Sequence, residues 1–463
     1  MRNNPEHRCT ESMNTRRLME GIESGNIDLA VIGSGYVGLT TAALFAEAGF
    51  CVTAVDKRST VVKALNSGRS SIHEAGLCEI IRRNTKCGRL TGSQDMKRAV
   101  SRANAILIAV QTQVDSSEKP DLSVLSRALS HMGRNFKRGA LIVVISTVPI
   151  GAMSGFVKKR LESSSQLKAE SDFLLAYSPE RMSPGNAVRE LHENTRIVGG
   201  IGPNSTEAGA RLFRKVCKRV IETDVKTAEA SKLAENAYRN TNIAFANQLA
   251  LICERAAVDS QQVIRMANTH PRVKVLTPGP GVGGPCLRKD SLILAHGFES
   301  DSTNLIRTAT ILNSYMANHV VEILGRGLVK VGKDLGSSRI AILGTAYKRD
   351  TDDTRESPSK RIVKELIASG ASVTSHDPNA RESFGAQRKD SVRECVTNAD
   401  GFVVVTDHSE FMNLNLSVIR KLMNDKPVIV DTRRIIDPCH ARRLGFEYYG
   451  IGLGSTPPKK ATG

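Results

Sequence analysis

The sequence predicts an α/β protein with two doubly wound domains that are joined by a long central helical segment. Two units in which an apolar run, a helical stretch and a second apolar run alternate begin near residues 27 and 339. Between them, residues 227–258 contain neither Gly nor Pro, as expected of one long helix. At 463 residues, the chain is long enough for two or three domains.

The composition excludes several classes of protein. The net charge is +18, but the basic residues are spread along the chain, there is no Trp, and aromatic residues make up only 4%. We therefore expect pockets for anionic ligands and no nucleic-acid partner. No apolar run is long enough to span a membrane, and the first 26 residues lack the apolar stretch of a secretory signal. We interpret residues 1–26 as a disordered extension.

The cysteines indicate neither a disulfide framework nor a metal site. Nine are scattered along the chain without a CxxC pair, a pattern that favours a reducing cytoplasm. We therefore expect no zinc site and a cytoplasmic protein.

The first unit carries the pattern of a dinucleotide-binding, Rossmann-like domain. An apolar run typical of a buried parallel strand precedes Gly33-Ser-Gly35-Tyr-Val-Gly38, and a second apolar run ends at Asp56. In this arrangement Gly33 allows a tight turn, Gly35 lets a pyrophosphate approach the backbone, and Gly38 lets the helix pack closely on the strand. Asp56 would bind the adenosine ribose and repel a 2′-phosphate, so the sequence favours NAD over NADP.

Two further strand ends are candidates for the nicotinamide side of that site. Apolar runs at residues 105–110 and 141–145 are followed by Thr112 and Thr147. Ligands of such sheets bind at the carboxyl ends of the strands. These threonines are either cofactor contacts or ordinary strand-end hydroxyls.

The central helical stretch leads to a loop with a candidate nucleophile. Lys232, Asn236 and Arg239 share one helix face, which could bind a sugar and an oxyanion or could be an ordinary solvated face. Four prolines and four glycines in about fifteen residues then form a shaped loop that ends at Cys286. A helical run follows, and a helix N-terminus favours a thiolate, so Cys286 and the nearby Asp290 are candidates for covalent chemistry.

A second doubly wound unit completes the chain. An apolar run at residues 339–343 precedes Gly344, and Ser357-Pro358 is a typical helix start. Further strands are expected at residues 371–375, 402–406, 428–431 and 448–453. Two such units around one nucleophile loop suggest an enzyme that brings two nucleotides together.

With these elements in order, the chain resembles the UDP-glucose/GDP-mannose dehydrogenase family from about residue 27 to about residue 454. The matching motifs are GSGYVGL (33–39), STVP (146–149), SPER with PGN (178–186), KLAENAYRNTNIAFANQLA (232–250), GVGGPCLRKD (281–290) and GTAYKRDTDDTRESPS (344–359). The SPER and PGN pair and His270-Pro-Arg272-Val look like the N-acetylhexosamine branch. Two departures are Gln-Thr-Gln around Thr112, where relatives carry Pro-Thr-Pro, and Pro285 before the cysteine.

The resemblance implies an NAD-dependent, two-step oxidation of the C6 alcohol of UDP-N-acetyl-D-mannosamine to the uronic acid, through a thiohemiacetal and a thioester on Cys286. It implies a homodimer built on the central helix, and it assigns roles by motif. Catalytic residues would be Cys286, Lys232, Asn236, Asp290, Glu180 and Thr147. NAD would contact Gly33, Gly35, Tyr36, Val37, Gly38, Asp56, Thr112, Thr147, Lys289 and Arg355. The UDP-sugar would contact Arg181, Met182, Lys232, Asn236, Arg239, His270, Arg272, Gly284 and Lys348, and Arg272 would reach a neighbouring subunit.

The expected domains are an NAD-binding domain (27–215), a central helical and dimerisation domain with the cysteine loop (216–330), and a C-terminal UDP-sugar-binding domain (331–463). Three alternatives stay open. The substrate could be UDP-N-acetylglucosamine or UDP-glucose. The protein could be a one-step β-hydroxyacid-type dehydrogenase, although that class needs neither the thiol nor a second nucleotide domain. It could also be a non-catalytic nucleotide-sugar-binding protein.

Overall fold

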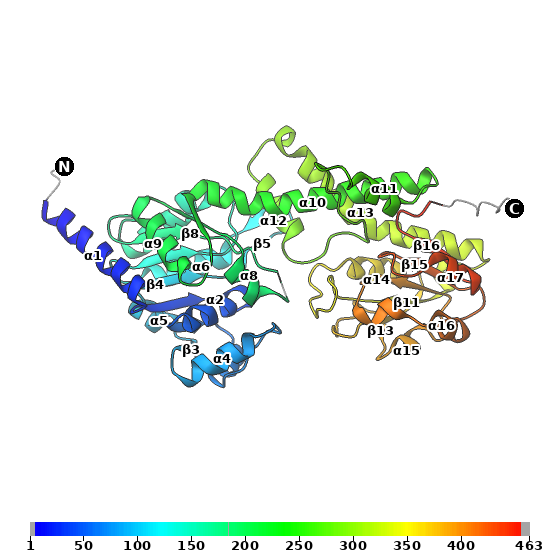
Figure 1. Ribbon diagram of the computed structural model, residues 1–463, viewed down its shortest axis with the longest axis horizontal. Coiled ribbons are helices and arrows are strands. Elements are labelled where there is room, and N and C mark those ends of the chain that lie inside the picture. Colours follow the sequence, from blue (N-terminus) through cyan, green and yellow to red (C-terminus); the bar gives the residue numbers. More distant parts are fainter. Residues whose placement is uncertain (1–4, 184, 455–463) are drawn as a thin grey trace. The chain divides into compact units, whose positions relative to one another are not determined.

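The apolar runs of the sequence form the strands of two mainly parallel sheets. A computed structural model of the protein describes residues 5–183 and 185–454. Contacts within the chain divide it into two units (Figure 1). Unit 1 consists of residues 1–235 and 292–296, and unit 2 consists of residues 236–291 and 297–463. The predicted central segment, 216–330, contributes to both units, and its status as a separate domain stays a prediction.

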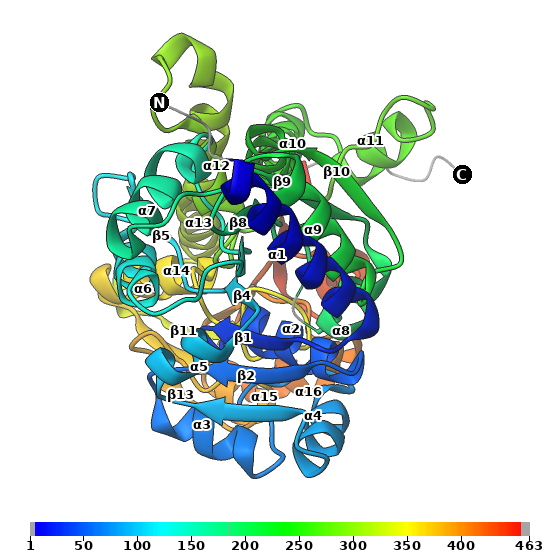
Figure 2. The same ribbon diagram turned by 90° about the vertical axis from the view of Figure 1, so that its left-hand side faces the viewer.

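Unit 1 is built on an eight-stranded sheet with the order β10-β9-β8-β7-β4-β1-β2-β3. All neighbours are parallel except β8 and β9. Figure 2 shows β3, β2, β1 and β4 lying side by side. The strands are β1 (Asp28–Ile32), β2 (Cys51–Val55), β3 (Leu90–Ser93), β4 (Ala105–Ile108), β7 (Leu141–Val144), β8 (Leu174–Tyr177), β9 (Arg196–Gly200) and β10 (Val220–Asp224). A separate hairpin pairs β5 (Gln113–Val114) with β6 (Pro120–Asp121).

Both faces of this sheet are covered by helices. Along β1, Leu29 and Val31 belong to one buried cluster and Ala30 and Ile32 to the other, as the two-residue period of a strand requires. The first cluster includes residues of α1 (Pro5–Ser24), α2 (Tyr36–Glu47), α3 (Ser59–Asn66), α4 (Leu77–Lys86), α8 (Ala187–Glu193) and α9 (Pro203–Arg214). The second includes residues of α5 (Met96–Arg102), α6 (Ser123–Gly133), the π-helical turn Met153–Val157 and α7 (Lys158–Ser165).

The N-terminal segment corrects one prediction. Residues 1–26 were expected to be disordered, but α1 covers Pro5–Ser24. Leu18, Met19 and Ile22 lie on one face of this helix and are buried in the first cluster of unit 1. The Lys215 ammonium also lies 2.9 Å from the Glu23 carboxylate. The expectation failed because three apolar residues at helical spacing are a weak signal within a polar segment.

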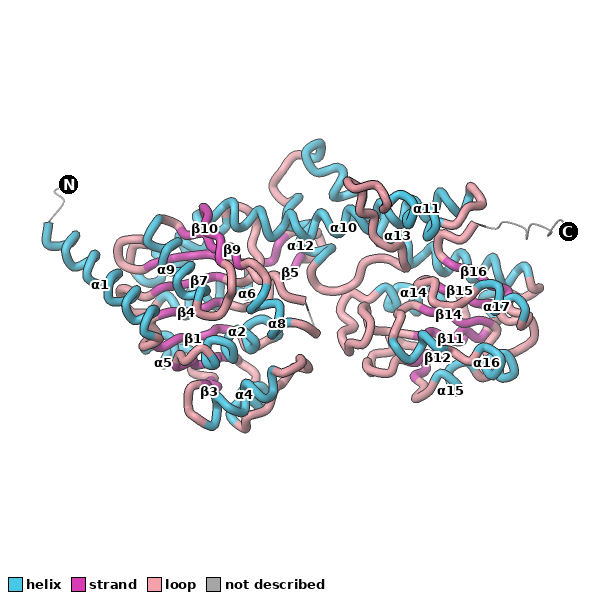
Figure 3. Tube along the Cα trace, viewed as in Figure 1, coloured by secondary structure: helices cyan, strands magenta, loops and turns pink. Residues whose placement is uncertain are grey.

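Unit 2 contains a six-stranded, all-parallel sheet with the order β13-β12-β11-β14-β15-β16 (Figure 3). The strands are β11 (Arg339–Leu343), β12 (Ser372–His376), β13 (Gln387–Arg388), β14 (Gly401–Val404), β15 (Val428–Asp431) and β16 (Glu447–Gly450). One face packs on α13 (Ser300–Lys330) and α14 (Pro358–Ala368), and the other on α15 (Val392–Val396), α16 (Leu416–Leu422) and α17 (Pro438–Arg443). The expected helix start is confirmed, since the Ser357 side chain accepts a hydrogen bond from Ser359 N and Pro358 is the first helical residue. The predicted α/β class with two doubly wound parallel sheets is thus confirmed.

The predicted long helix is α10 (Val225–Arg255), which is followed by α11 (Ser260–Ala267) and α12 (Leu287–Ala295). Within unit 2, buried amides join α10 to α13. Asn240 Nδ2 donates to Thr310 Oγ1 over 3.0 Å, and Asn247 Nδ2 donates to Asn313 Oδ1 over 2.9 Å. Buried amides that are fully paired fix the register of two packed helices, because any shift would leave them unsatisfied.

Candidate active site

The glycine turn of unit 1 has the geometry of a dinucleotide site. Gly33 has φ +94°, and its N–H donates to the Val55 carbonyl over 2.8 Å. A Cβ added at Gly38 would lie 1.7 Å from the Gly33 carbonyl oxygen, so only glycine fits. A Cβ at Gly35 would meet nothing within 4 Å. The backbone before α2 is therefore open to a pyrophosphate, and Gly35, as the N-cap, adds no side-chain cap to the helix N-terminus.

Asp56 lies beside this turn, at the end of β2. Its Oδ2 accepts a hydrogen bond from Ser34 N over 3.0 Å, and both of its oxygens accept from the Arg58 guanidinium. Burial alone would raise the pKa of Asp56, but the hydrogen bonds from Arg58 and Ser34 hold it below its ordinary value. The Arg58 side chain is 54% exposed. It can swing away and leave carboxylate lone pairs for ribose hydroxyls, so these residues fit NAD.

The other residues predicted to contact NAD in unit 1 differ in their surroundings. Thr112 is buried, and its Oγ1 has no hydrogen-bond partner in the described part of the chain. Thr147 is partly buried, and Val37 packs against the first cluster. The Tyr36 hydroxyl donates to the Glu74 carboxylate. A buried hydroxyl without a partner is a good candidate for a ligand contact, since leaving it unpaired costs free energy.

Glu180 organises the loop after β8. Its Oε1 accepts hydrogen bonds from the backbone N–H groups of Arg181 and Met182, over 2.7 and 2.8 Å. Its Oε2 lies 2.8 Å from the guanidinium of the buried Arg196. Arg181 itself is paired with Glu235 at 2.7 Å. Glu180 therefore holds the backbone of Arg181 and Met182, which are both predicted to bind the substrate, and this placement suits an orienting role.

In unit 2, the glycine loop packs tightly against a tyrosine. Gly281 and Gly284 have φ of +123° and +85°, which favour glycine. A Cβ at Gly283 or Gly284 would lie 2.5 or 2.8 Å from Tyr347. The loop is also anchored by a hydrogen bond of 3.0 Å from Gly284 N to the Arg355 carbonyl. The loop conformation thus depends on glycine at these positions.

Cys286 follows directly and is exposed. Its carbonyl oxygen accepts the Asp290 N–H over 2.8 Å, so the thiol is carried by the residue that opens α12. This confirms the expected placement of the cysteine between loop and helix. Backbone N–H groups at a helix N-terminus stabilise a thiolate.

A buried carboxylate lies one turn further along the helix. Asp290 is fully buried, and its Oδ2 accepts a hydrogen bond of 2.6 Å from Asn236 Nδ2. The Lys289 ammonium lies 3.1 Å from Oδ1, yet within the described residues this oxygen accepts no hydrogen bond. The contact is therefore an ion pair without hydrogen-bond geometry. Oδ1 keeps an open lone pair that could take a proton from water or hold a polar substrate group.

The remaining predicted residues lie on several elements. Lys232 is buried on α10 in unit 1, one turn before Asn236. Arg239 on α10 is exposed, as are His270 and Arg272 on the segment after α11. Lys348 is partly buried on the loop after β11.

Arg355 was predicted to bind NAD. Its guanidinium Nε and Nη2 donate to the Asp353 carboxylate over 2.8 and 2.5 Å. This side-chain hydrogen bond raises the pKa of Arg355 above its ordinary value. The contact of Arg355 with NAD stays a prediction.

Two residues of this region were not selected from the sequence. Burial, with the negative charges of Asp353 and Cys286, raises the pKa of Tyr347 to about 12, so its phenol stays protonated beside the glycine loop. Arg433 follows β15, donates to the Val405 carbonyl over 2.8 Å and lies against Gly279. Tyr347 belongs to the quoted GTAYK motif, and Arg433 follows a strand end, so both had a signal in the sequence.

Within the described residues, no group of His, Cys, Asp or Glu is arranged to hold a metal ion. Over the same part of the chain, no helix is long and apolar enough to cross a membrane.

A Rossmann-like glycine turn with a strand-end acid is the feature expected of a nucleotide-dependent oxidoreductase, and the chain also carries an exposed cysteine at the start of a helix beside a buried carboxylate. Residues 27–217 match the NAD binding domain of the UDP-glucose/GDP-mannose dehydrogenase family, residues 226–315 its central domain and residues 341–438 its UDP binding domain. The chain belongs to this family.

Two named proteins and one solved structure are similar to the chain over most of its length. The chain is 39% identical over 428 residues to a UDP-N-acetyl-D-mannosamine dehydrogenase from Pyrococcus horikoshii, covering 92% of this chain and 99% of that protein. It is 35% identical over 416 residues to an NDP-N-acetyl-D-galactosaminuronic acid dehydrogenase from Ralstonia nicotianae, covering 88% and 95%. A solved structure of a UDP-D-ManNAc dehydrogenase from Pyrococcus horikoshii has a TM-score of 0.87 at 38% identity, covering 93% of this chain and all of that one.

The two glycines of the first turn can be tested against each other. We expect Gly38→Ala to lower Tm and abolish NAD binding, because the new Cβ would collide with the Gly33 carbonyl. We expect Gly35→Ala to keep Tm near the wild-type value, since its Cβ enters open space, but to weaken NAD binding about tenfold or more by blocking the pyrophosphate. Thermal unfolding and NAD titration measure both effects. Equal losses of Tm in the two variants would contradict this assignment.

Proposed function

We propose that the protein oxidises the C6 alcohol of UDP-N-acetyl-D-mannosamine to the carboxylate, using two NAD⁺. The observation that carries this proposal is the exposed Cys286 at the start of α12, in a chain that matches both an NAD binding and a UDP binding domain. A thiol is needed when an alcohol is carried past the aldehyde to the acid, because it holds the aldehyde covalently for the second oxidation. The named relatives support the sugar.

The proposed reaction has four steps. The alcohol loses a hydride from C6 and a proton from its oxygen, which gives an aldehyde. The Cys286 thiolate adds to C6, forming a C–S bond and an oxyanion. Loss of a second hydride from C6 gives a thioester, and water breaks the C–S bond to release the carboxylate and the thiol. NAD⁺ supplies the chemistry of accepting each hydride.

In unit 2, Asn236 and Asp290 suit the two stages at which charge or a proton must be handled, the oxyanion and the attack of water. Asn236 is held by Asp290 Oδ2, so its amide is fixed in orientation and can donate to an oxyanion with its second N–H. Asp290 Oδ1 has an open lone pair and could receive a proton from the attacking water. For Lys232, which precedes Asn236 by one turn on α10, the matched motif implies oxyanion stabilisation or a role as acid and base.

Further roles follow from the matched motifs. In unit 1, Thr147 and Glu180 would order the hydrolytic side. Arg181, Met182, Lys232, Asn236, Arg239, Gly284 and Lys348 would bind the UDP-sugar. Tyr36, Val37, Thr112, Lys289 and Arg355 would complete the NAD contacts made by the glycine turn and Asp56. His270 and Arg272 are exposed after α11, which suits residues that complete the site of a second copy of the chain.

The exposed apolar residues of α10 favour a homodimer. Tyr238, Phe245 and Ile252 are 63%, 56% and 55% exposed. They are seven residues apart and so form one stripe along the helix, the spacing of a helix–helix seam. We propose that this stripe packs against the same stripe of a second copy. A cytoplasmic location is proposed because the nine cysteines are scattered along the chain without a CxxC pair.

The reaction itself can be tested directly. Purified protein with NAD⁺ should release two NADH per UDP-N-acetylmannosamine and form a product with the mass of the uronic acid. UDP-N-acetylglucosamine and UDP-glucose are the matched substrates. Turnover of one of these alone would correct the sugar and keep the chemistry, whereas no NADH from any of them, with NAD bound, would contradict the proposed function.

The covalent step has its own test. In Cys286→Ser we expect carboxylate formation to fall by at least about a thousandfold, since a serine hydroxyl is a far weaker nucleophile than a thiolate. Product mass and NADH per sugar are the measurements, and Cys439→Ser, an exposed cysteine in unit 2, is the control. Full uronic-acid production by Cys286→Ser would exclude the thioester.

The dimer interface can be tested with one charge. We expect Phe245→Glu to shift the protein from dimer to monomer, because a carboxylate would be buried in an apolar seam. Sedimentation or light scattering gives the mass, and Val329→Glu, at an exposed apolar residue of α13, is the control. A wild-type monomer, or a Phe245→Glu dimer as stable as wild type, would refute this interface.

A further inference from the structure

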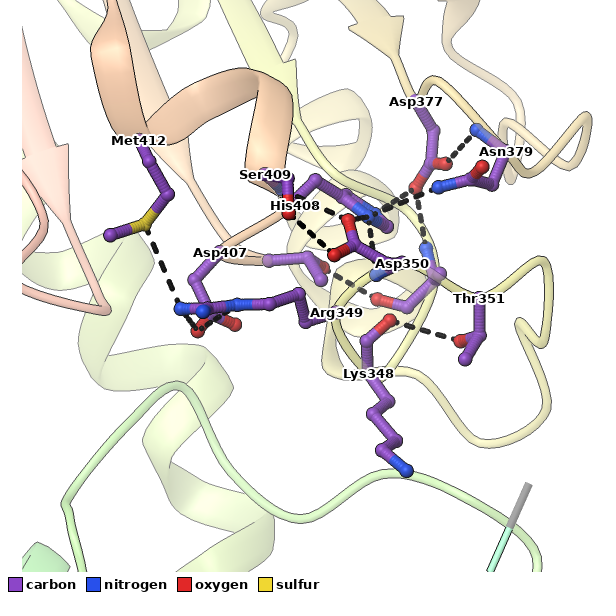
Figure 4. A network of polar contacts seen from close by, with 12 residues as sticks. Lys348, Arg349, Asp350, Thr351, Asp377, Asn379, Asp407, His408, Ser409 and Met412 are labelled. Carbon is purple, nitrogen blue, oxygen red and sulfur yellow. Dashed lines mark hydrogen bonds and ion pairs between the residues drawn. The ribbon is translucent and has the colours of Figure 1, made fainter. Parts of the chain in front are cut away.

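The loop after β11 is clamped by residues that follow β14. Figure 4 shows Arg349 and Asp350 of this loop facing Asp407, His408 and Ser409. Arg349 Nε donates to Asp407 Oδ2 over 3.0 Å, and Ser409 N and Oγ donate to the Asp350 carboxylate over 2.9 and 2.6 Å. Three consecutive side chains thus hold two consecutive loop residues.

The centre of this clamp is a buried histidine. His408 is fully buried, and its Nδ1 accepts the backbone N–H of Asp350 over 2.9 Å. A backbone N–H can only donate, so Nδ1 carries no proton and the ring proton must be on Nε2. Nε2 donates to Asp377 Oδ2 over 3.0 Å. The neutral imidazole therefore bridges the end of β12 to the loop, and the Phe411 ring packs edge-on against it at 5.6 Å.

At the other end of this bridge, both carboxylate oxygens of Asp377 accept several hydrogen bonds. Asp377 occupies in unit 2 the strand-end position that Asp56 occupies in unit 1. Its carboxylate accepts four backbone N–H groups and the His408 ring, with the backbone donors being Thr345, Ala346, Asn379 and Ala380. Burial would raise the pKa of Asp377, but the His408 hydrogen bond and these backbone N–H groups hold it far below its ordinary value. All of the donors belong to the protein, and none is an exposed side chain that could swing away as Arg58 can.

Asp377 is therefore a structural acid. It closes the glycine turn of unit 2 and fixes His408, and it leaves no lone pair for a ribose in the manner of Asp56. A nucleotide bound by unit 2 must therefore be held by groups other than Asp377.

Lys348 is the residue next to the clamped pair. Figure 4 shows its side chain pointing away from the network of Asp377, His408 and Asp350. Asp350 has φ +54°, in the left-handed region, which aspartate adopts more readily than most non-glycine residues but less readily than the right-handed region. The contacts of His408 and Ser409 stabilise this conformation, and with it the direction in which the chain presents Lys348.

We propose that His408 is a positioning residue for the UDP moiety: it fixes the loop so that Lys348 is held ready for the diphosphate or sugar of the UDP-linked substrate. This inference rests on the proposed function for its substrate, while UDP itself follows from the matched UDP binding domain. A loop that is fixed before binding avoids the entropic cost of ordering it, so the benefit appears as affinity for UDP.

Two amide substitutions separate the functions of the ring. In His408→Gln the amide nitrogen can take the place of Nε2 and still donate to Asp377, but the acceptor for Asp350 N is lost. In His408→Asn the amide oxygen can take the place of Nδ1 and keep that acceptor, while the link to Asp377 is lost. His440, an exposed histidine of α17 in the same unit, gives the matched controls His440→Gln and His440→Asn.

The test is titration of the full-length protein with UDP and with NAD⁺, together with Tm and steady-state kinetics. We expect the Kd for UDP to rise about tenfold in His408→Gln, on the scale of one lost hydrogen bond, and less in His408→Asn. The Kd for NAD⁺, and kcat at saturating UDP-sugar, should stay within about twofold of wild type, because the effect is confined to binding by the UDP loop.

The outcomes are distinct. A fall in Tm with an unchanged Kd for UDP in both variants would make His408 merely structural and overturn the proposal. Equal loss of UDP and NAD⁺ binding, or equal effects in the His440 controls, would do the same, as would a wild-type protein that does not bind UDP. If the wild type binds UDP but oxidises no UDP-sugar, the proposed function fails, and the Kd values for UDP still decide the role of His408.

Discussion

The close approach of backbone to its surroundings at a few glycines is the constraint on which both units depend. In unit 1, α2 can start directly over the first turn because Gly38 carries no side chain against the Gly33 carbonyl. In unit 2, Gly283 and Gly284 let the glycine loop before Cys286 lie against Tyr347. In unit 1 the close approach leaves backbone N–H groups, and not side chains, at the helix N-terminus, where an anionic group can bind. A methyl group at Gly38 or at Gly284 would push apart the elements that meet there.

The charges around Cys286 illustrate how one buried carboxylate can serve several groups. Asp290 is fully buried, so it must be compensated, and the Asn236 amide and the Lys289 ammonium do so at 2.6 and 3.1 Å. In return, Asp290 fixes the orientation of Asn236. The same carboxylate keeps one oxygen without a hydrogen bond from the described residues, which is costly unless a ligand or water uses it. Fixed orientation and open basicity are what an oxyanion stabiliser and a proton acceptor require.

The two strand-end acids show how related folds can be used in different ways. Asp56 and Asp377 both accept a backbone N–H from the glycine turn beside them. Asp56 is otherwise paired with the exposed Arg58, whereas Asp377 is closed off by backbone N–H groups and the buried His408. The first has an exposed partner that can move away from it, and the second acts as part of the framework. Burial of the partner, more than the identity of the acid, decides whether the carboxylate can accept a ligand.

Much of this molecule is determined by local sequence alone. Apolar runs, glycine turns and the Ser357-Pro358 helix start have short-range physical causes, so the strands, α10 and the placement of Cys286 before α12 could be predicted. The helix over Pro5–Ser24 was not predicted because burial of Leu18, Met19 and Ile22 depends on a sheet formed by distant segments, and residues 1–4 lie outside the described residues. For the same reason the pairing of Asn236 with Asp290, the ion pair of Glu180 with Arg196, and the bridge from His408 to Asp377 and Asp350 were decided only by the tertiary structure. Each joins side chains that are far apart in the chain, and no local pattern encodes which of many polar residues will meet once the sheets have formed.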